Sequence, residues 1–251
     1  MHLTENRRIY AIGDVHGCRD ALDALLRQID ADLAVRPHDR PLLVLLGDYT
    51  DRGPDSRGVL DRLIARMRGP VQTVCLLGNH DHSFLRFIQE PQTMMTPKYH
   101  WLDTALGGQA TLASYGVTDL TDRDAAYAAF TESVPAEHLT FLQDLTPMLR
   151  LGGYVFVHAG LRPGVALDKQ DIDDLIWIRE PFLSYPHDHP GIVVHGHTAV
   201  PEVEHHGNRI AVDTGAVFGG RLSCLVLEGG GVWTLQDGTL HPCPPGTGLA
   251  P

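Results

Sequence analysis

Short apolar runs, each ending near a glycine that is followed by polar residues, recur in the N-terminal third of the chain. They span Ile9 to Ile12, Leu42 to Leu46 and Val71 to Leu77. Apolar runs of this length that stop at turn signals are typical of buried strands. The sequence therefore predicts three strands, with polar residues just beyond the carboxyl end of each.

Apolar residues at helical spacing follow the first two of these runs. They extend from Ala21 to Leu33 and from Val59 to Met67, the second stretch lying behind the helix-start signal Pro54-Asp55-Ser56. This alternation of strand, loop and helix predicts a layered α/β fold. In such folds the site lies beyond the carboxyl ends of the strands.

A change to a mostly helical pattern marks residues 89-151, from about Gln89 to Leu151. Helices are expected over Ala125 to Thr131 and from Ser133-Val134-Pro135 to about Asp144. We interpret this segment as a helical insertion within one domain that covers residues 1-251. A single domain of this length is within the range of α/β folds.

Strands are expected again in the C-terminal part of the chain. Their ranges are Tyr154 to Val157, Ile192 to Val194, Arg209 to Val212, Leu222 to Leu227 and Gly231 to Leu235. Glu228-Gly229-Gly230 separates the last two and predicts a hairpin turn. The tail, residues 241-251, is rich in proline and glycine, and we expect it to be poorly ordered.

Composition places the chain among soluble globular proteins, with 43% hydrophobic and 20% charged residues. No stretch approaches the roughly 18 apolar residues of a membrane span, and the N-terminal sequence has no export signal. The four cysteines are far apart and form no CxxC pair, which argues against a disulfide framework or a thiolate zinc site. We therefore expect a cytoplasmic protein without a membrane partner.

The net charge limits the kind of partner. Thirty-one acidic residues against 20 basic ones give a formal charge of -11. This disfavours a groove that follows a nucleic-acid backbone, because such a groove must neutralise phosphates. A small phosphorylated substrate held by a few local cations stays compatible with this charge.

Five polar signatures directly follow predicted strands. They are Gly13-Asp14-Val15-His16-Gly17, Gly47-Asp48-Tyr49-Thr50-Asp51-Arg52-Gly53, Gly78-Asn79-His80-Asp81, His158-Ala159-Gly160 and His195-Gly196-His197-Thr198. Carboxylate and carboxamide oxygens with imidazole nitrogens suit manganese, iron or zinc. Each signature alone also fits ordinary turn chemistry, but the five together indicate a metal site.

Together these strings resemble the signature set of the metal-dependent phosphoprotein phosphatases, of the bacterial serine/threonine type, within the calcineurin-like metallophosphoesterases. The resemblance covers Gly13 to Thr198. It implies a β-sandwich flanked by helices in four αββα layers. It also implies two divalent metal ions, manganese in the first place, with iron, zinc or cobalt as alternatives.

Residue by residue, the resemblance implies a set of metal ligands. Asp14 and His16 would bind the first metal, Asp48 would bridge both, and Asn79, His158 and His197 would bind the second. His195 is interpreted as a structural neighbour of His197 and not as a ligand.

Four further residues match catalytic positions of the family. His80, oriented by Asp51, would act as the general acid that gives a proton to the leaving oxygen. Arg52 and Arg179, together with Asn79, would hold the substrate phosphate. Arg179 lies in the looser motif Leu175-Ile176-Trp177-Ile178-Arg179-Glu180, and a surface or packing role is its alternative.

The substrate class stays open between two branches of the family. Asp81 stands where the phosphoprotein branch usually has glutamate, and in this it is similar to the symmetrical diadenosine tetraphosphatases. Asp51 stands where that sister branch typically has alanine, which favours phosphomonoesters. Ala199 occupies a position at which nuclease relatives carry a further ligand, which argues against a nuclease.

We therefore expect a two-metal phosphomonoester hydrolase that uses direct in-line attack of a metal-bridging hydroxide. Its substrate would be a phosphorylated protein, as for a serine/threonine protein phosphatase, or a small phosphoester. The alternatives are a symmetrical bis(5'-nucleosyl)-tetraphosphatase and a catalytically silent, metal-binding regulatory protein. The 89-151 insertion is expected to influence substrate choice.

Overall fold

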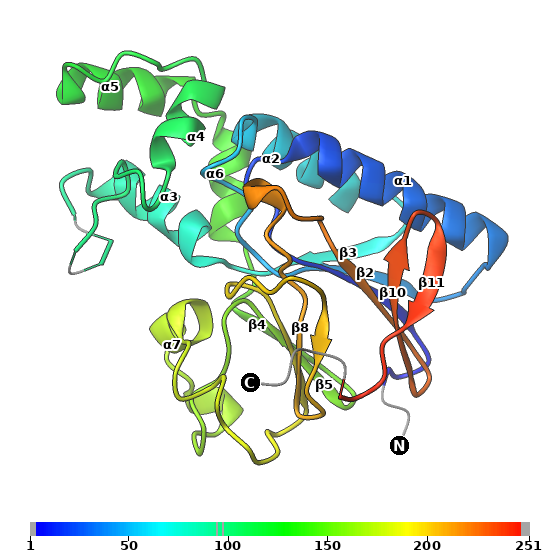
Figure 1. Ribbon diagram of the computed structural model, residues 1–251. Coiled ribbons are helices and arrows are strands. Elements are labelled where there is room, and N and C mark those ends of the chain that lie inside the picture. The colour runs from blue at the N-terminus through cyan, green and yellow to red at the C-terminus, as the bar shows by residue number, and fades with distance from the viewer. Residues whose placement is uncertain (1–3, 94, 97, 247–251) are drawn as a thin grey trace.

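The computed structural model describes residues 4–93, 95–96 and 98–246 (Figure 1). Two β-sheets lie face to face at the centre of the molecule, and helices cover their outer surfaces. This is the predicted α/β sandwich in four αββα layers. None of the described helices is long and apolar enough to span a membrane.

The first sheet has six strands in the order β11-β10-β9-β1-β2-β3. Its bounds are β1 (Arg8–Ile12), β2 (Pro41–Leu45), β3 (Gln72–Cys75), β9 (Cys224–Glu228), β10 (Gly231–Gln236) and β11 (Thr239–Pro242). β1, β2 and β3 are parallel, and the other neighbours pair antiparallel. The carboxyl ends of β1, β2 and β3 therefore meet at one edge.

The second sheet has five strands in the order β4-β5-β6-β8-β7. Its bounds are β4 (Met148–Leu151), β5 (Tyr154–Val157), β6 (Ile192–His195), β7 (Glu204–His205) and β8 (Arg209–Ala211). β5, β6 and β8 are parallel, so their carboxyl ends also share one edge, while β4 and β7 are antiparallel edge strands.

Helices from the N-terminal half of the chain cover the first sheet, and a shorter helix covers the second (Figure 1). Of these, α1 (Arg19–Val35), α2 (Ser56–Met67) and α6 (Ala136–Gln143) lie along the sheet. α3 (Asn79–Gln89), α4 (Gly108–Ser114) and α5 (Arg123–Ser133) lie further out, at the left of Figure 1. Helix α7 (Ile172–Trp177) packs on the second.

Both faces of the central strands are buried, which explains why the sequence shows continuous apolar runs and not an alternating pattern. In β1, Ile9 and Ala11 pack into the core between the sheets, whereas Tyr10 and Ile12 pack under the helices. The inter-sheet core continues across the other sheet through Phe156 and its neighbours. The two sheets are thus held together by apolar side chains of alternate strand residues.

Two predicted boundaries were wrong. The helical insertion was expected to reach Leu151, but Met148–Leu151 forms β4 and pairs with β5, because Gly152, at a φ of 58°, turns the chain back. The tail was expected to be poorly ordered from His241, yet the Cys243 N–H bonds Val232 O at 2.9 Å and the Gly246 N–H bonds His205 O at 2.7 Å. Residues 247–251 lie outside the described part of the chain.

Replacement of Phe156 by alanine tests the inter-sheet core. The side chain is fully buried between the sheets, so Phe156→Ala should lower the free energy of unfolding by about 3–5 kcal/mol. Urea unfolding measures the change. Val35→Ala on α1, where the side chain is 82% exposed, is the control and should stay within about 0.5 kcal/mol of wild type. Equal effects of the two variants would contradict this core.

Candidate active site

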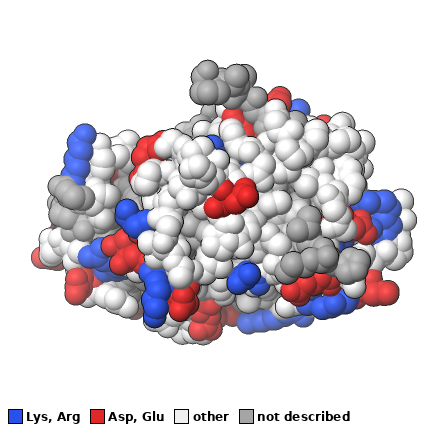
Figure 2. All heavy atoms as spheres, turned by 90° about the horizontal axis from the view of Figure 1, so that it is seen from below, with Lys and Arg blue, Asp and Glu red and all other residues white. Residues whose placement is uncertain are grey.

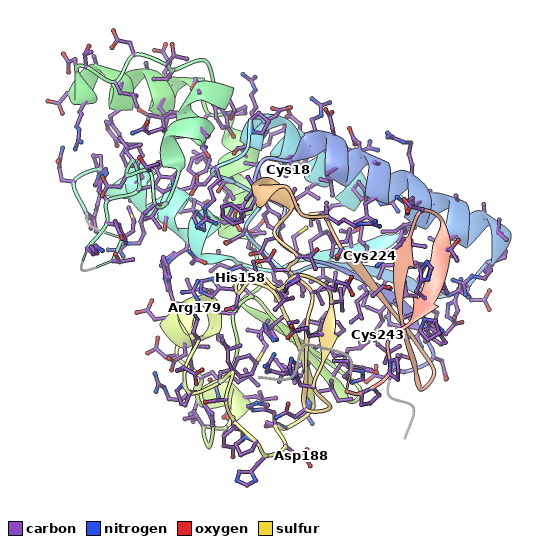
Figure 3. The ribbon with its side chains drawn as sticks, viewed as in Figure 1. Cys18, His158, Arg179, Asp188, Cys224 and Cys243 are labelled. Atoms are coloured by element: carbon purple, nitrogen blue, oxygen red, sulfur yellow. The ribbon has the colours of Figure 1, made fainter. Side chains whose placement is uncertain are left out.

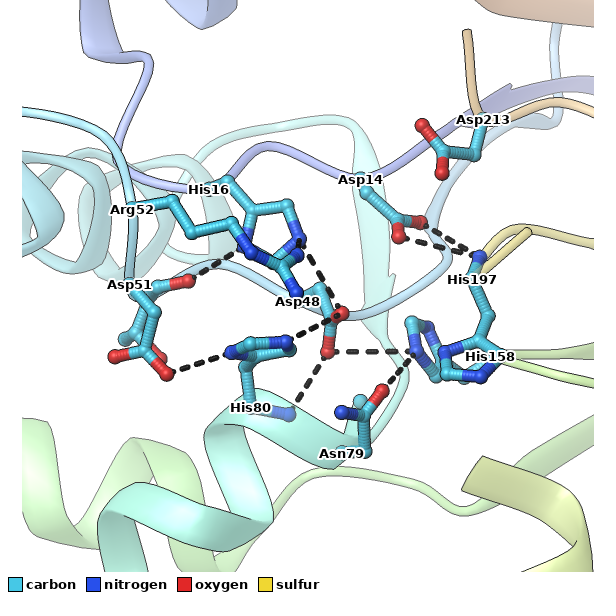
Figure 4. A network of polar contacts seen from close by, with 12 residues as sticks. Asp14, His16, Asp48, Asp51, Arg52, Asn79, His80, His158, His197 and Asp213 are labelled. Carbon is cyan, nitrogen blue, oxygen red and sulfur yellow. Dashed lines mark hydrogen bonds and ion pairs between the residues drawn. The ribbon is translucent and has the colours of Figure 1, made fainter. Parts of the chain in front are cut away.

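The polar signatures of the two sheets meet at one place, where the carboxyl ends of the parallel strands face each other (Figure 4). Asp14 and His16 follow β1, Asp48 follows β2, and Asn79 begins α3 after β3. From the second sheet, His158 follows β5 and His197 follows β6. The topology thus explains why residues 183 positions apart, such as Asp14 and His197, are in contact.

Strained backbone is concentrated at this place. Of the eight described non-glycine residues with a φ above zero, five are predicted site residues: His16, Asp48, Asp51, Arg52 and His197, with φ between 42° and 74°. The left-handed conformation costs an ordinary side chain roughly 1–2 kcal/mol. Such strain persists only where the surrounding structure imposes it, and it is typical of functional sites.

Two glycines of the signatures let the chain approach the site carboxylates. A Cβ on Gly78 would lie 2.2 Å from the backbone nitrogen and Oδ1 of Asp48, and a Cβ on Gly196 would lie 2.2 Å from Oδ1 of Asp14. No side chain larger than hydrogen fits at these distances. The signatures therefore need glycine for close packing around the carboxylates.

Asp48 is shared by two groups of possible metal ligands. One group contains His16, Asp48 and His80, the other contains Asp48, His158 and His197, and the ligand atoms within each group lie within 4.8 Å of one another. Oδ2 of Asp48 is 3.4 Å from Nε2 of His16, and Oδ1 is 3.4 Å from Nε2 of His158. Its two carboxylate oxygens therefore point to different groups.

The donor set fits divalent cations. His197 Nε2 is buried without a hydrogen-bond partner among the described residues, which is costly for a ring nitrogen unless a cation or another group satisfies it. Asn79 Oδ1 lies 3.0 Å from Nε2 of His158 and adds an oxygen to the second group. Nitrogen and oxygen donors without thiolates suit manganese, iron, cobalt or zinc.

Backbone carbonyls fix the orientation of two of these rings. The Nδ1 of His16 lies 2.8 Å from Thr50 O, and the Nδ1 of His158 lies 2.9 Å from Leu46 O. A carbonyl accepts from N–H, so each ring carries its hydrogen on Nδ1. Nε2 is then the nitrogen that faces the ligand group, and a cation bound there would take the place of any proton on it, as is usual at metal sites.

Burial and neighbouring charges shift the pKa values of the group. Burial and the adjacent Asp213 raise the pKa of Asp14 well above its usual range. Burial lowers the pKa of His16 to about 3. For His158 burial acts downwards, but Asp48 and Asp14 raise its pKa to about 10. The site thus concentrates buried negative charge, which divalent cations would neutralise.

His80 and Asp51 form a buried pair that extends into the insertion. The Nδ1 of His80 lies 2.7 Å from Oδ2 of Asp51. The Trp101 indole donates to the same oxygen at 2.7 Å, and the Thr111 hydroxyl donates to Oδ1 at 2.7 Å. Asp51 and Trp101 are fully buried. The orientation of His80 therefore depends on two residues of the 89-151 segment.

The two arginines differ in their position. Arg52 reaches into the first group, with Nη1 2.6 Å from Nε2 of His16. Arg179 is exposed just after α7 (Figure 3), and its charge contributes to lowering the pKa of His197 after the effects of burial and His158. The structure thus brings Arg52 into the polar network and leaves Arg179 at its margin.

Asp14 belongs to neither three-residue group. Its carboxylate oxygens accept from the His197 backbone N–H at 3.1 and 3.2 Å, on the side of the second sheet (Figure 4). The pairing of Asp14 with His16 on one metal therefore stays a prediction. His195 is buried against Phe182, with ring centroids 5.0 Å apart, and is in neither group.

Asp81, which stands where the phosphoprotein branch usually has glutamate, supports the backbone of the site. Its carboxylate is fully buried and accepts from the N–H groups of Asp48, Tyr49 and Gly78 at 2.8, 3.0 and 3.2 Å. These bonds hold the Asp48 turn against the start of α3. The residue has no direct access to a substrate, so its identity carries little information about one.

Three residues at this site, Asp213, Trp101 and Thr111, are not among those predicted from the sequence. Asp213 is buried and lies beside Asp14 (Figure 4), and it follows a predicted strand as the other site carboxylates do. That position was a usable signal. No sequence signal marks Trp101 and Thr111, because a tryptophan and a threonine in a helical segment are equally compatible with simple packing roles.

An α/β sandwich with carboxylates and histidines of both sheets gathered at the strand ends is the arrangement of a metal-dependent hydrolase. The family model described as calcineurin-like phosphoesterase matches residues 7–224. The chain therefore belongs to the calcineurin-like phosphoesterases and is a metal-dependent phosphoester hydrolase, in agreement with the resemblance noted in its sequence.

Several relatives are similar over most of their length. Asymmetrical bis(5'-nucleosyl)-tetraphosphatase PrpE of Anoxybacillus flavithermus is 27% identical over 235 residues, which cover 85% of this chain and 88% of the relative. The protein of that name from Bacillus subtilis is 28% identical over 232 residues, with 84% and 87% covered.

Solved structures share the fold. The crystal structure of a provisionally assigned diadenosine tetraphosphatase has a TM-score of 0.64 at 25% identity and covers 96% of both chains. A cold-active protein-tyrosine phosphatase of a Shewanella species has a TM-score of 0.57 at 17% identity, with 97% of this chain and 83% of that chain covered. The second likeness concerns the fold alone.

Trp101→Phe tests whether the insertion orients His80. Phenylalanine keeps the ring in the aromatic core beside Phe84 but removes the hydrogen bond to Asp51. We expect kcat on a substrate with a poor leaving group to decrease about 10-fold, since hydrogen bonds to charged groups contribute roughly 1.5–3 kcal/mol.

The matched control is Trp233→Phe on β10, a partly buried tryptophan at the far end of the first sheet. Circular dichroism should show both variants folded. If Trp101→Phe keeps the kcat of the control variant on poor leaving groups, the indole does not position the acid.

Proposed function

We propose that this phosphoester hydrolase uses two divalent cations and acts preferentially on dinucleoside polyphosphates. The observation that carries the proposal is the carboxylate of Asp48, whose two oxygens point to different histidine groups. One carboxylate between two ligand groups is suited to holding two ions at short separation. The relatives named as tetraphosphatases support the substrate class.

Six residues are proposed to hold the cations. The first ion would be bound by Asp14, His16 and Asp48, and the second by Asp48, Asn79, His158 and His197. When bound, two such ions activate a water for in-line attack and neutralise charge on the phosphoryl oxygens. Manganese is the first candidate, since histidine, carboxylate and amide ligands accept it and several similar ions.

The protein groups around the ions are proposed to bind phosphate and move a proton. The Arg52 guanidinium beside His16 is shaped for paired hydrogen bonds to phosphoryl oxygens. Asn79 and, from the margin, Arg179 would add contacts to the same phosphate. His80, held through Nδ1 by Asp51, would give the proton on Nε2 to the leaving oxygen.

A phosphorylated protein is the second candidate substrate. The Asp51–His80 pair favours this substrate, because a general acid accelerates the reaction most when the leaving group is a poor one, such as the serine alkoxide of phosphoserine. A polyphosphate leaving group needs less help. The catalytically silent alternative is opposed by the presence of every ligand, arginine and acid expected of an active member.

Cytoplasmic location and the absence of a nucleic-acid groove are also proposed. None of the four cysteines forms a disulfide in the described part of the chain, which is typical of a reducing compartment. Figure 2 shows Lys and Arg interspersed with Asp and Glu around one face, without a continuous basic stripe. A groove for a nucleic-acid backbone would need such a stripe.

A side-by-side assay tests the substrate proposal. We expect kcat/KM with manganese to be at least about 100-fold higher for diadenosine tetraphosphate than for a phosphoserine peptide, equivalent to about 2.7 kcal/mol in transition-state binding. Chromatography of the products distinguishes symmetrical cleavage into two ADP from asymmetrical cleavage into ATP and AMP. A 100-fold preference for the peptide would reverse the order of the two candidates.

Asp48→Asn tests the shared carboxylate. An amide offers a single neutral oxygen, so the metal affinity of both sites should decrease by roughly 10-fold or more. The occupancy of the two sites should therefore decrease together. Elemental analysis after dialysis against limiting manganese gives the stoichiometry. Asp188→Asn, in an exposed loop (Figure 3), is the control and should keep two ions per chain. Full occupancy in Asp48→Asn would exclude a bridging role.

His80→Asn tests the proposed acid. The variant should retain its metals and lose about 10²-fold or more in kcat on substrates with poor leaving groups. Nitrophenyl phosphate, whose leaving group needs little protonation, should be affected much less. Similar losses on both kinds of substrate would assign His80 to another role, such as that of a metal ligand. Its Nε2 lies 4.0 Å from Oδ2 of Asp48, within the first ligand group.

A further inference from the structure

A cavity of about 620 Å³ opens beside Arg52, between the insertion and the loop that follows Asp213. The insertion lines it with exposed residues that include Thr104 and Gln109, and the loop lines it with Val217 and Phe218. Small-molecule sites commonly have volumes of about 300–1,000 Å³. The cavity is therefore large enough for a nucleoside.

Phe218 is the unusual residue of this cavity. Its side chain is 70% exposed, and it is the one aromatic among the large hydrophobic residues that are exposed in the described ranges. It ends a short 3-10 helix (Ala216–Phe218) between Gly215 and Gly219, both of which have a positive φ. A single exposed apolar ring is not unusual by itself, but this ring borders the cavity beside Arg52 and offers an aromatic face to a ligand there.

Arg52 connects this cavity to the proposed metal site. Its guanidinium carbon lies 5.5 Å from the centroid of the Phe218 ring, and its Nη1 lies 2.6 Å from His16 Nε2. Gly107 keeps the arginine in place, because its carbonyl accepts from the Arg52 N–H at 3.1 Å. A phosphate held by Arg52 would therefore carry its next substituent towards the aromatic ring.

We infer that the cavity is a nucleoside subsite in which the base of a nucleotide stacks on Phe218 while Arg52 holds the adjoining phosphate. A flat aromatic ring on an aromatic side chain beside a guanidinium is a common mode of base recognition. Gln109 Nε2 donates to Leu102 O at 2.8 Å, which leaves its amide oxygen, and the hydroxyl of Thr104, for the polar edge of the base. The inference rests on the proposed function and specifies which part of the substrate is recognised.

Binding of two matched probes tests the subsite. α,β-Methylene-ADP and methylenediphosphonate share a P–C–P group that resists hydrolysis, and they differ by the nucleoside. Titration calorimetry with the manganese-loaded enzyme should give about 10-fold tighter binding of the nucleotide. Phe218→Leu, which keeps apolar volume but removes the aromatic face, should bring the two affinities within about twofold. Phe218→Tyr should preserve the difference.

Val35→Ala, which alters an exposed apolar residue far along α1, is the control and should keep the wild-type ratio. The inference is overturned if wild-type enzyme binds the two probes equally, or if Phe218→Leu keeps the wild-type ratio. It is also overturned if Phe218→Leu weakens a phosphoserine peptide and leaves the nucleotide ratio intact, because the cavity would then hold peptide.

Turnover of diadenosine tetraphosphate separates this inference from the proposed function. Wild-type enzyme that binds the nucleotide probe selectively but does not hydrolyse the tetraphosphate contradicts the proposed substrate and leaves the subsite supported. Wild-type enzyme that hydrolyses the tetraphosphate, with a probe ratio that does not depend on Phe218, supports the function and overturns the subsite.

Discussion

The position of the Asp48 carboxylate between two histidine groups is the constraint on which this site depends. Its oxygens point to His16 on one side and His158 on the other, and Asp48 itself has a left-handed backbone, with a φ of 54°. The strain is offset by hydrogen bonds, chiefly from the Asp48 N–H to the buried Asp81 carboxylate. Gly78, at which no larger residue fits, completes the turn.

The same turn continues to Asp51 and Arg52, and through them the insertion becomes part of the site. The Trp101 indole and the Thr111 hydroxyl donate hydrogen bonds to Asp51. The Gly107 carbonyl accepts a hydrogen bond from the backbone N–H of Arg52. The insertion therefore has two roles at the site. It orients the proposed acid through Asp51, and it lines the cavity beside Arg52. A segment in such a position is well placed to influence specificity.

Much of this arrangement was predictable from sequence because the end of each buried strand is marked by a change from apolar to polar residues. Apolar runs that stop at Gly-Asp, Gly-Asn or histidine predicted the strands and the residues that follow them. The resemblance to a known family then implied the sandwich and grouped Asp48, His158 and His197 in one site. The edge strand Met148–Leu151 was not predicted, since it is short and only partly buried. Trp101 escaped because its role comes from tertiary packing, which no local pattern encodes.

The most direct test of a shared Asp48 is a crystal structure of the manganese-loaded protein with anomalous scattering recorded at the manganese edge. The account predicts two anomalous peaks about 3.5–4 Å apart, each within about 2.2 Å of a different oxygen of the Asp48 carboxylate. A single peak, or two peaks of which only one contacts Asp48, would contradict it.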